Sequence, residues 1–300
     1  MTLNSLSAGT KYYYRAVIQF GETDYYGEPK SFTTLAAQQS TLGGYLELPA
    51  ATSGSNLYNE MLGKGTSRNY SYSYDKTMYA SVWEAYPLTA SHISGSASSN
   101  WSFNPNIAQT DQIDVVGNSY GTNYGNSLYS RGHQVPNADR KNSSMNAATY
   151  YVTNQTPQTQ NKFNGSVWGT LETAIRNLTS STDTVYVVTG PVYKKVGGSE
   201  TINYLTAAKT TVKPSKIPVP NYYWKAVLKV KRTNGVVTSA QAVGFWFEHK
   251  EYESGTSYTP YAVSVDQIEA WTGLDLFANL PDTIEAAAES NSSWTTFQSF

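Results

Sequence analysis

Two short segments constrain this chain more than any other part of its sequence. Ser-Arg-Gly-His occupies residues 130–133, and 31 residues after the histidine the chain reads Asn-Gly-Ser-Val-Trp-Gly-Thr-Leu-Glu, at residues 164–172. Beyond the asparagine, apolar side chains recur every three or four positions, at Trp168, Leu171, Ile175 and Leu178. This period predicts a helix over residues 165–178 with one buried face. Since we expect the histidine to come from a preceding strand, the two segments predict strands and then a helix around one site.

The residue types in these segments suit phosphodiester hydrolysis. That reaction needs a base for water, a cation on the phosphate oxygens and donors for the developing charge. An ordinary histidine titrates near ~6.5, so His133 can act as a neutral base. Asn164 offers an amide oxygen to Mg²⁺, which prefers oxygen ligands and keeps several waters, and Glu172 is placed to hold one of those waters. Arg131 and Arg176 carry planar groups suited to phosphate oxygens.

Each of these residues has a simpler interpretation when it is taken alone. Asn164 at a helix start is more often an N-cap than a metal ligand. Glu172 and Arg176 are four residues apart, a spacing that is usually a solvated ion pair on a helix. A lone His133 would more often be structural. The joint occurrence of these residues in this order favours a site.

The same segments resemble the active-site block of the sugar-nonspecific DNA/RNA endonucleases, the ββα-metal nucleases that include endonuclease G. The family pattern is Asp-Arg-Gly-His, then an Asn four residues before a Trp, then a Glu four residues after it. Ser130 stands at the Asp position, and the other members are in place. Segments similar to the family's later strands and turns follow in the family's order, at residues 185–193, 217–225, 242–247 and 263–274.

The resemblance implies an α+β fold with a central, mainly antiparallel sheet flanked by helices. It implies Mg²⁺-dependent cleavage of DNA and RNA without sequence preference, with 5′-phosphate products and Mn²⁺ as an alternative cation. By the same resemblance His133 is the general base, Asn164 binds the metal directly and Glu172 orders the metal's water. Arg131 and Arg176 are then expected to stabilise phosphate charge.

Two positions depart from the family pattern. Ser130 replaces a carboxylate with a hydroxyl, which donates and accepts hydrogen bonds but carries no charge. Ser99 stands where the family usually has a phosphate-binding Arg, so we expect another cation, for instance Arg140, to supply that contact. Asn154 matches a family asparagine near the site and is expected to support the metal region. The departures keep open a second hypothesis, that the chain is a catalytically weak or inactive nuclease-fold module that binds or lies on a surface.

Charge and cysteine content narrow the function further. The formal net charge is -1, whereas proteins that bind nucleic acid over a broad surface are usually basic. This favours an enzyme whose positive charge is local. The absence of cysteine excludes disulfides and thiolate metal sites. No apolar run reaches membrane-spanning length and residues 1–20 lack a signal-peptide core; no feature of the sequence indicates an oligomeric state.

The composition also bears on location. Charged residues make up only 14% of the chain and there are 25 tyrosines, a polar, β-rich composition that is common in exported proteins. Asn-Gln-Thr at residues 154–156 and Asn-Gly-Ser at residues 164–166 are both glycosylation sequons. A glycan on Asn164 would destroy the expected metal ligand. We therefore expect a bacterial protein that is secreted, periplasmic or on the cell surface.

The N-terminal residues read as part of a different module. Residues 7–20 alternate in polarity and residues 26–34 read as a second strand, and together they resemble the last two strands of a fibronectin type III-like domain. Such a sandwich needs about seven strands, and two strands alone are marginal in water. We expect residues 1–35 to be the end of a truncated module, 36–43 a linker and 44–300 the catalytic domain. The alternative is a hairpin that belongs to the catalytic domain.

Local patterns predict three further elements. Tyrosines at positions 70, 72 and 74 alternate with serines, which predicts a strand with one aromatic face, in the core or available for base stacking. Ser264 and Gln267 form a capping pattern for a helix over residues 265–272, which Gly273 should end. A short helix at residues 284–289 is expected to give way to a polar tail.

Overall fold

The centre of the molecule is one antiparallel sheet. The computed structural model describes residues 11–33, 43–63, 68–96, 100–180 and 184–300. Among these the sheet has seven strands in the order β15-β14-β13-β10-β7-β6-β5, and each neighbouring pair is antiparallel. The strands are β5 (Leu57–Met61), β6 (Ser71–Asp75), β7 (Ala80–Leu88), β10 (Val185–Val192), β13 (Tyr222–Thr233), β14 (Val236–Glu248) and β15 (Ala262–Val263). The expected α+β fold with a mainly antiparallel sheet is confirmed.

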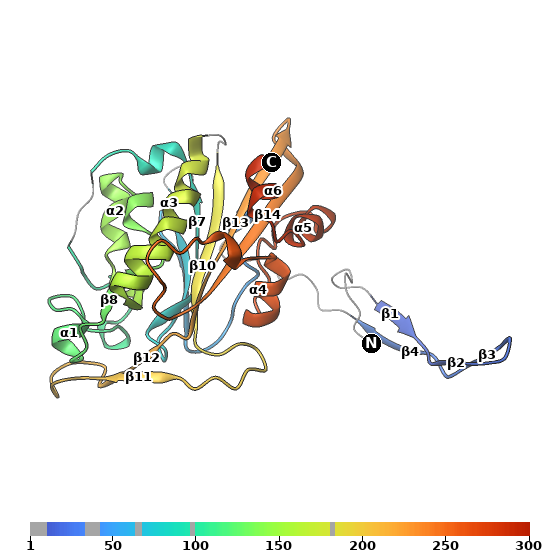
Figure 1. Cartoon of the computed structure of the whole chain (residues 1–300), viewed down its shortest axis with the longest axis horizontal. Helices are drawn as coiled ribbons and strands as arrows, with labels where there is room; N and C mark the ends of the chain where they lie inside the picture. Colours follow the sequence, from blue (N-terminus) through green and yellow to red (C-terminus); the bar gives the residue numbers. More distant parts are fainter. Residues whose placement is uncertain (1–10, 34–42, 64–67, 97–99, 181–183) are drawn as a thin grey trace.

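Helices cover both faces of this sheet (Figure 1). Side chains alternate along β13, so that Tyr223 and Val227 belong to one core while Trp224 and Ala226 belong to the other. The first core includes residues of α3 (Gly169–Asn177) and α6 (Trp294–Ser299). The second core includes residues of α4 (Val265–Thr272) and α5 (Asp282–Glu289). The two faces of the sheet therefore carry separate layers of helix.

Between β7 and β10 the chain leaves the sheet and forms a region with a hairpin and a helix. The hairpin is β8 (Tyr129–His133) paired antiparallel with β9 (Gln155–Thr159), and α3 follows it. This is the two strands and a helix that the sequence predicts. The region also holds α1 (Tyr120–Asn123), α2 (Ser143–Thr149) and the 3₁₀ turns Ala90–Ile93, Gln109–Asp111, Asn137–Asp139, Val152–Asn154 and Leu178–Ser180.

The helix after the hairpin begins later than expected. The predicted helix over residues 165–178 is α3 only from Gly169, and it is preceded by a segment of wide π-type turns, Gln160–Trp168, with a non-helical Ser166. Phe163 and Trp168 are both buried and stack with their ring centroids 5.5 Å apart. Wide turns place residues that are five apart on the same side of the segment. This lets Phe163 and Trp168 stack, and the regular helix α3 begins only after them. The predicted apolar face is buried as expected.

Two other local predictions are confirmed. The tyrosines at 70, 72 and 74 are buried in the first core, so their rings pack inside and are not available to stack on bases. Ser264 Oγ accepts a hydrogen bond from the Gln267 backbone N–H at 3.1 Å. Gly273 ends α4 with φ of 74°, in the left-handed region that favours glycine.

The C-terminal residues correct the sequence analysis, which expects a polar tail. They form α6, whose N-cap Ser293 accepts a hydrogen bond from Thr296 N–H. Trp294 and Phe297 lie three residues apart, on one face of this helix, and both are buried in the first core. Burial of these two aromatic rings stabilises a helix here even though the residues around them are polar, because large buried rings contribute most to the packing energy of such a segment.

The N-terminal residues form two short ladders. β1 (Lys11–Tyr14) pairs with β4 (Lys30–Thr33), and β2 (Val17–Phe20) pairs with β3 (Thr23–Tyr26). Each of the two expected strands is thus interrupted once, at residues 15–16 and 27–29. The second interruption contains Pro29, which has no N–H to donate to a ladder. These strands lie apart from the large sheet (Figure 1). Residues 1–10 and 34–42, with most of the expected linker, lie outside the described residues, and the assignment of 1–35 to a separate module remains a prediction.

The remaining elements are peripheral. β11 (Asn203–Thr206) and β12 (Lys216–Val219) form a separate two-stranded ladder, and Thr259–Tyr261 is a 3₁₀ turn before β15. Within the described ranges, every helix is too short or too polar to cross a membrane.

Candidate active site

Strand β8 carries the Ser-Arg-Gly-His segment and runs beside β9. Its register pairs His133 with Gln155 and Gly132 with Thr156. A Cβ atom on Gly132 would lie 2.2 Å from atoms of the Gln158 side chain, which is completely buried. A larger residue at position 132 would therefore force the buried Gln158 side chain to move. The close packing of this hairpin fixes the position of the histidine that ends it.

His133 lies in an aromatic surrounding. Its ring centroid is 4.9 Å from that of Trp101 and 5.0 Å from that of Tyr150, with the Tyr150 ring nearly perpendicular. Its Nε2 atom is buried and, among the described residues, has no hydrogen-bond partner. Burial, and then the nearby Arg131 charge, lower the pKa of His133 to about 4. The imidazole is therefore neutral at pH 7, with one ring nitrogen able to accept a proton.

Asn164 is linked to the same strand through Ser130. The Asn164 amide nitrogen donates to Ser130 Oγ at 3.1 Å and to Gln160 Oε1 at 3.2 Å. Ser130 Oγ in turn donates to the Gln158 backbone oxygen at 3.2 Å. Within the described part of the chain, these bonds leave the Asn164 side-chain oxygen without a hydrogen bond. Asn164 lies in the wide turns before α3 and is not its N-cap, so the simpler interpretation of this residue is wrong.

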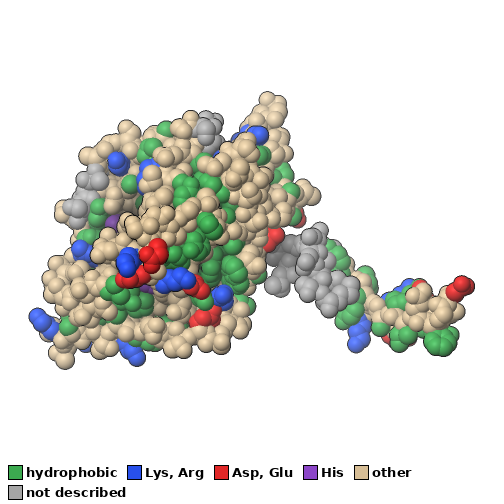
Figure 2. Space-filling view, viewed as in Figure 1, with side chains coloured by type: hydrophobic (Ala, Val, Ile, Leu, Met, Phe, Trp, Pro, Cys, Tyr) green, Lys and Arg blue, Asp and Glu red, His purple; other side chains and the backbone are tan. Residues whose placement is uncertain are grey.

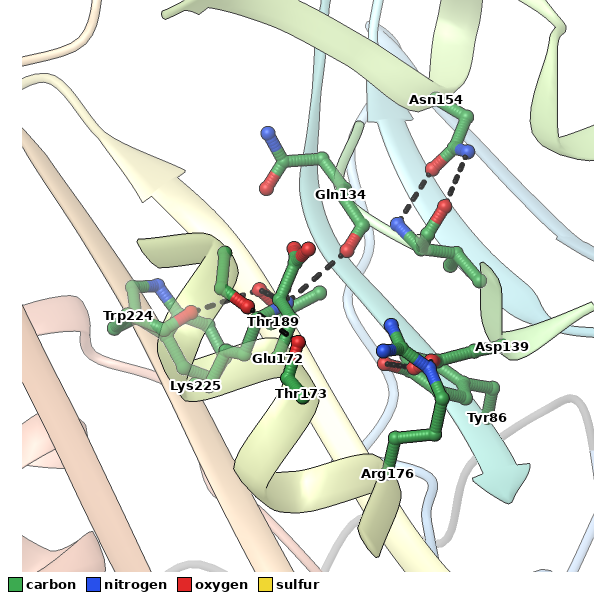
Figure 3. Close-up of polar contacts among 12 residues, drawn as sticks. Tyr86, Gln134, Asp139, Asn154, Glu172, Thr173, Arg176, Thr189, Trp224 and Lys225 are labelled. Carbon is green, nitrogen blue, oxygen red and sulfur yellow. Dashed lines mark hydrogen bonds and ion pairs between the residues drawn. The ribbon is translucent and has the colours of Figure 1, made fainter. Parts of the chain in front are cut away.

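Glu172 forms its ion pair with a residue of the sheet. Lys225 Nζ lies 3.7 Å from Glu172 Oε1, and it donates at 3.2 Å to both the Gln134 backbone oxygen and Thr189 Oγ1 (Figure 3). Burial raises the pKa of Glu172 to about 7, although the Lys225 charge acts in the opposite direction. Burial also lowers the pKa of Lys225. Gln134, whose backbone oxygen Lys225 contacts, directly follows His133 in the chain.

Arg176 pairs with Asp139. Its Nε atom lies 2.6 Å from Asp139 Oδ1, and Tyr86 donates to the second carboxylate oxygen at 2.9 Å (Figure 3). The solvated helix pair that the simpler interpretation of Glu172 and Arg176 predicts is therefore not formed. Each side chain instead meets an opposite charge from outside α3, Lys225 on β13 or Asp139 before α2.

Arg131 is partly engaged within the protein. Its Nη1 atom donates to the backbone oxygens of Val115 at 2.8 Å and Val116 at 3.2 Å. Its guanidinium lies above the Trp101 ring, 4.6 Å from the centroid. A guanidinium has five N–H donors, so Nε and Nη2 remain for a ligand. The Trp101 ring thus contacts both Arg131 and His133.

The hypothesis that Arg140 contacts phosphate is wrong. Its side chain is completely buried and lies over the Tyr86 ring, 4.8 Å from the centroid. Its donors are used within the protein, by the oxygens of Asn69, Asp139 and Pro87. A charge with this many internal partners would have to leave the core to meet a substrate. Ser99, the position whose missing cation Arg140 was expected to supply, lies outside the described residues.

Asn154 supports the segment that follows His133. Its side-chain oxygen accepts from Val135 N–H at 2.8 Å, and its amide nitrogen donates to the backbone oxygens of Val135 at 3.0 Å and Thr149 at 2.8 Å (Figure 3). The side chain is completely buried. This agrees with the expected supporting role, because Val135 lies two residues beyond the histidine.

Three residues for which the sequence predicts no role also lie in this region. Lys225, Asp139 and Glu84 are all buried, and burial raises the pKa of Glu84 to about 8, against the nearby Lys225 charge. Lys225 is the only charged residue among the otherwise aromatic and aliphatic residues 222–228, and this pattern distinguishes it in the sequence. Asp139 lies in a polar loop and no sequence pattern distinguished it.

Comparison with known proteins gives concordant similarities. Residues 53–283 match the protein family described as DNA/RNA non-specific endonuclease. A nuclease of Nostoc sp. is 30% identical over 229 residues, which cover 74% of this chain and 75% of that protein. The mitochondrial nuclease 1 of Schizosaccharomyces pombe is 34% identical over 164 residues, 53% of this chain and 49% of its own length. EndoG, solved in complex with EndoGI, shares the fold with a TM-score of 0.59 at 23% identity, over 77% of this chain and 91% of that one.

Proposed function

Because the chain belongs to the DNA/RNA non-specific endonuclease family, we propose that it hydrolyses phosphodiester bonds of both DNA and RNA, with His133 as the general base. Two side-chain atoms that have no hydrogen-bond partner among the described residues support this proposal. His133 Nε2 is buried without a hydrogen-bond partner among the described residues, and the Asn164 side-chain oxygen is also without one there. Ser130 ties Asn164 to the strand that His133 ends. A base and a cation ligand are thereby held by one short strand.

The proton step follows from the state of His133. Its lowered pKa, about 4, leaves the imidazole neutral at pH 7, so the ring accepts a proton from water as the water oxygen attacks phosphorus. The bond from phosphorus to the 3′ oxygen breaks. The 3′ oxygen leaves with the electron pair and takes a proton from water, and the phosphate stays on the 5′ oxygen of the other product. Trp101 and Tyr150 contact the ring on two sides and keep its orientation.

The surroundings of Asn164 fit a hard divalent cation, Mg²⁺ or alternatively Mn²⁺. Mg²⁺ usually takes only one or two protein oxygens and keeps several waters. Such an ion, when bound, supplies positive charge to the phosphate oxygens. Ser130 and Gln160 both occupy the amide nitrogen of Asn164, so its oxygen is the atom left to face a cation. A neutral ligand leaves the full charge of the ion for the substrate.

Charged side chains complete the proposed site. We assign Arg131 and Arg176 to the phosphate oxygens, through the guanidinium donors that Val115, Val116 and Asp139 do not use. Glu172 is assigned to ordering water next to the cation. Lys225 opposes the effect of burial on the pKa of Glu172, and so favours the charged carboxylate that this role requires.

Incubation of the full chain with plasmid DNA and with total RNA tests the proposed activity. We expect both substrates to be degraded in Mg²⁺ and neither in EDTA. His133→Ala, purified in the same way, controls for contaminating nuclease and should be inactive. If the wild-type protein retains DNA and RNA on a filter but cleaves neither in Mg²⁺ or Mn²⁺, the chain is instead a binding module with a nuclease fold.

The proposed location is outside the cytoplasm of a bacterium: secreted, periplasmic or on the cell surface. A low content of charged residues, 14%, supports this, as does the similarity to a bacterial nuclease, whereas the fission yeast relative is mitochondrial. Fractionation of the source cells with an antibody to this chain tests the proposal. Detection only in the cytoplasmic fraction would contradict it.

A further inference from the structure

A second group of ionisable side chains lies on the face of the central sheet that is opposite to α3. Helices α4 and α5 cover the face of the sheet opposite to α3. These helices and the turn between them carry six carboxyl groups: Asp266, Glu269, Asp275, Asp282, Glu285 and Glu289. Among the described residues, none of these six forms an ion pair with lysine or arginine. The negative charge is therefore uncompensated.

Three of these carboxyl groups converge. Asp266 and Glu269 lie one turn apart on α4, and Glu289 ends α5. One carboxylate oxygen from each lies within 4.8 Å of the other two. Three carboxylate oxygens this close together can all contact one divalent cation, and Ca²⁺ takes such ligands at about 2.3–2.6 Å.

The burial of Glu289 is an independent observation that points to a ligand at this cluster. Its side chain is 5% exposed, and its Oε1 atom is buried without a hydrogen-bond partner in the described residues. Glu285, one turn earlier on α5, also has a buried Oε1 atom without a partner there. Burying a carboxylate without a partner is costly, so such groups are usually paired or bind a metal. Glu289 is directed at the two carboxylates of α4.

We propose that Asp266, Glu269 and Glu289 bind one Ca²⁺ ion that joins α4 to α5 and stabilises this side of the fold. Ca²⁺ takes oxygen ligands in flexible arrangements and accepts both oxygens of a carboxylate. Glu269 can serve as a ligand through its Oε2 atom, because Oε1 already accepts from the Leu276 N–H at 2.6 Å. That bond also fixes the turn after α4 to the same carboxylate. The ion stabilises the protein and takes no part in hydrolysis.

The electrostatics of the cluster are consistent with a bound cation. Burial, and then repulsion by neighbouring carboxylates, raise the pKa values of Glu269 and Glu289. The pKa of Glu285 is raised to about 8 by the same causes. Either protons or a cation must therefore neutralise these groups near neutral pH, and the experiment has to separate the two.

Thermal unfolding and calorimetry of the Asn164→Ala variant test the proposal. This background removes the proposed active-site ligand, so that a calcium effect cannot come from there. After chelation and dialysis, titration with CaCl₂ should give one site per chain. Ca²⁺ at about a hundred times the Kd should raise Tm by roughly 5 °C. Mg²⁺ at the same concentration should raise it less.

Glu289→Gln in the same background preserves shape and hydrogen-bonding capacity but removes a charged ligand. It should abolish the calcium-dependent rise in Tm, whereas the exposed Glu253→Gln should retain it in full. If Glu289→Gln does not fold, Asp266→Asn, at an exposed ligand, provides the same comparison. A protein whose Tm does not respond to Ca²⁺, or responds equally with and without Glu289, holds this cluster together by protons, and the proposal is wrong. A larger effect of Mg²⁺ than of Ca²⁺ would overturn the choice of ion.

Discussion

At the scale of single residues, the most informative feature is how few atoms near His133 remain available to a substrate. Most polar atoms there are used by the protein itself: Arg140 by backbone oxygens, Arg176 by Asp139 and Lys225 by Gln134 and Thr189. Within the described residues, the buried polar atoms without a hydrogen-bond partner include His133 Nε2 and side-chain atoms of Glu84, Gln134 and Gln158. Leaving such atoms buried and unpaired costs free energy, and for the imidazole of His133 we propose a chemical use.

Replacement of His133 tests that use directly. His133→Ala should lower turnover by at least the ~10²–10⁴-fold typical of general acid–base catalysis. The circular dichroism spectrum should be unchanged, because the ring lies at the end of a strand and no hydrogen bond of its Nε2 is lost. Steady-state cleavage of a fluorescent oligonucleotide provides the measurement. Near wild-type turnover would place the base elsewhere.

Ser130 offers a second test, of the link between the strand and the proposed cation ligand. Ser130→Ala removes the hydroxyl that accepts from the Asn164 amide at 3.1 Å. A neutral hydrogen bond contributes about 0.5–1.5 kcal/mol, so the Mg²⁺ concentration for half-maximal activity should rise roughly two- to tenfold. The exposed Ser127→Ala should leave it unchanged. An effect on turnover at saturating Mg²⁺ alone would mean that Ser130 does not act through Asn164.

At the scale of secondary-structure elements, one side chain links the β8–β9 hairpin to the central sheet. His249 follows β14 and connects two other segments. Its Nε2 accepts from the Thr159 N–H at 3.0 Å, at the end of β9, and its Nδ1 lies 2.8 Å from the Pro220 backbone oxygen before β13. Together the two bonds require a neutral ring with its proton on Nδ1, because Nε2 can accept only while it is unprotonated. The contact between the β8–β9 hairpin and the sheet is therefore sensitive to protonation of His249.

This sensitivity has a definite sign. Burial lowers the pKa of His249 to about 4, from 6.5. The unfolded chain therefore binds the proton more readily, and the contribution of His249 to stability is complete above about pH 6.5 and is lost as the pH falls towards 4. The difference in Tm between the wild type and His249→Ala should shrink over this window. A difference that stays constant from pH 7 to 4.5 would contradict the assignment.

The last helix gives another prediction at this scale. Phe297 is completely buried although it lies in a polar C-terminal stretch. Phe297→Ala should lower the free energy of unfolding by about 3–5 kcal/mol, as for other buried aromatic residues. Gln298→Ala, which changes an exposed residue of the same helix, should have little effect. Denaturant unfolding of both variants would reveal a loosely attached α6 if the two behave alike.

At the scale of the whole molecule, the protein consists of a large two-faced sheet and a small N-terminal pair of ladders. The N-terminal strands expose large apolar side chains: Tyr13, Tyr14, Val17, Ile18, Phe20, Tyr25 and Tyr26. The catalytic part, in contrast, buries most of its aromatic residues in three hydrophobic clusters. Figure 2 shows this contrast, with a main body whose surface is mostly polar and a slender extension with hydrophobic side chains on it. We propose that the ladders belong to a separate fibronectin type III-like module.

Deletion of residues 1–40 tests this division. Because the ladders share no sheet with the catalytic part, nuclease activity and Tm should remain nearly unchanged. The comparison needs only the full chain and the shortened one, assayed with the same substrate and by calorimetry. A loss of several degrees in Tm would show that the hairpin packs on the catalytic part and belongs to it.

The sequence by itself determined the class of fold, the order of the elements around the site and the identity of the family. These follow from information that is local in the chain. The spacing of Trp168, Leu171 and Ile175 reports a buried helix face, and Ser264 with Gly273 delimits α4, because burial and capping each depend on a few neighbouring residues. The segments at 130–133 and 164–172 carry the family resemblance for the same reason.

Only the tertiary structure decided which charges meet. Arg176 and Asp139 are 37 residues apart, and Arg140 reaches Asn69 across 71. No period or cap records such partners, since they depend on which elements pack side by side and on how burial weighs against charge. A buried charge needs a partner, and a sequence shows that the charge exists but not where its partner will be. That is why the sequence does not indicate the buried position of Arg140, and why the surroundings of Lys225 and the cluster at Glu289 are apparent only in the folded chain.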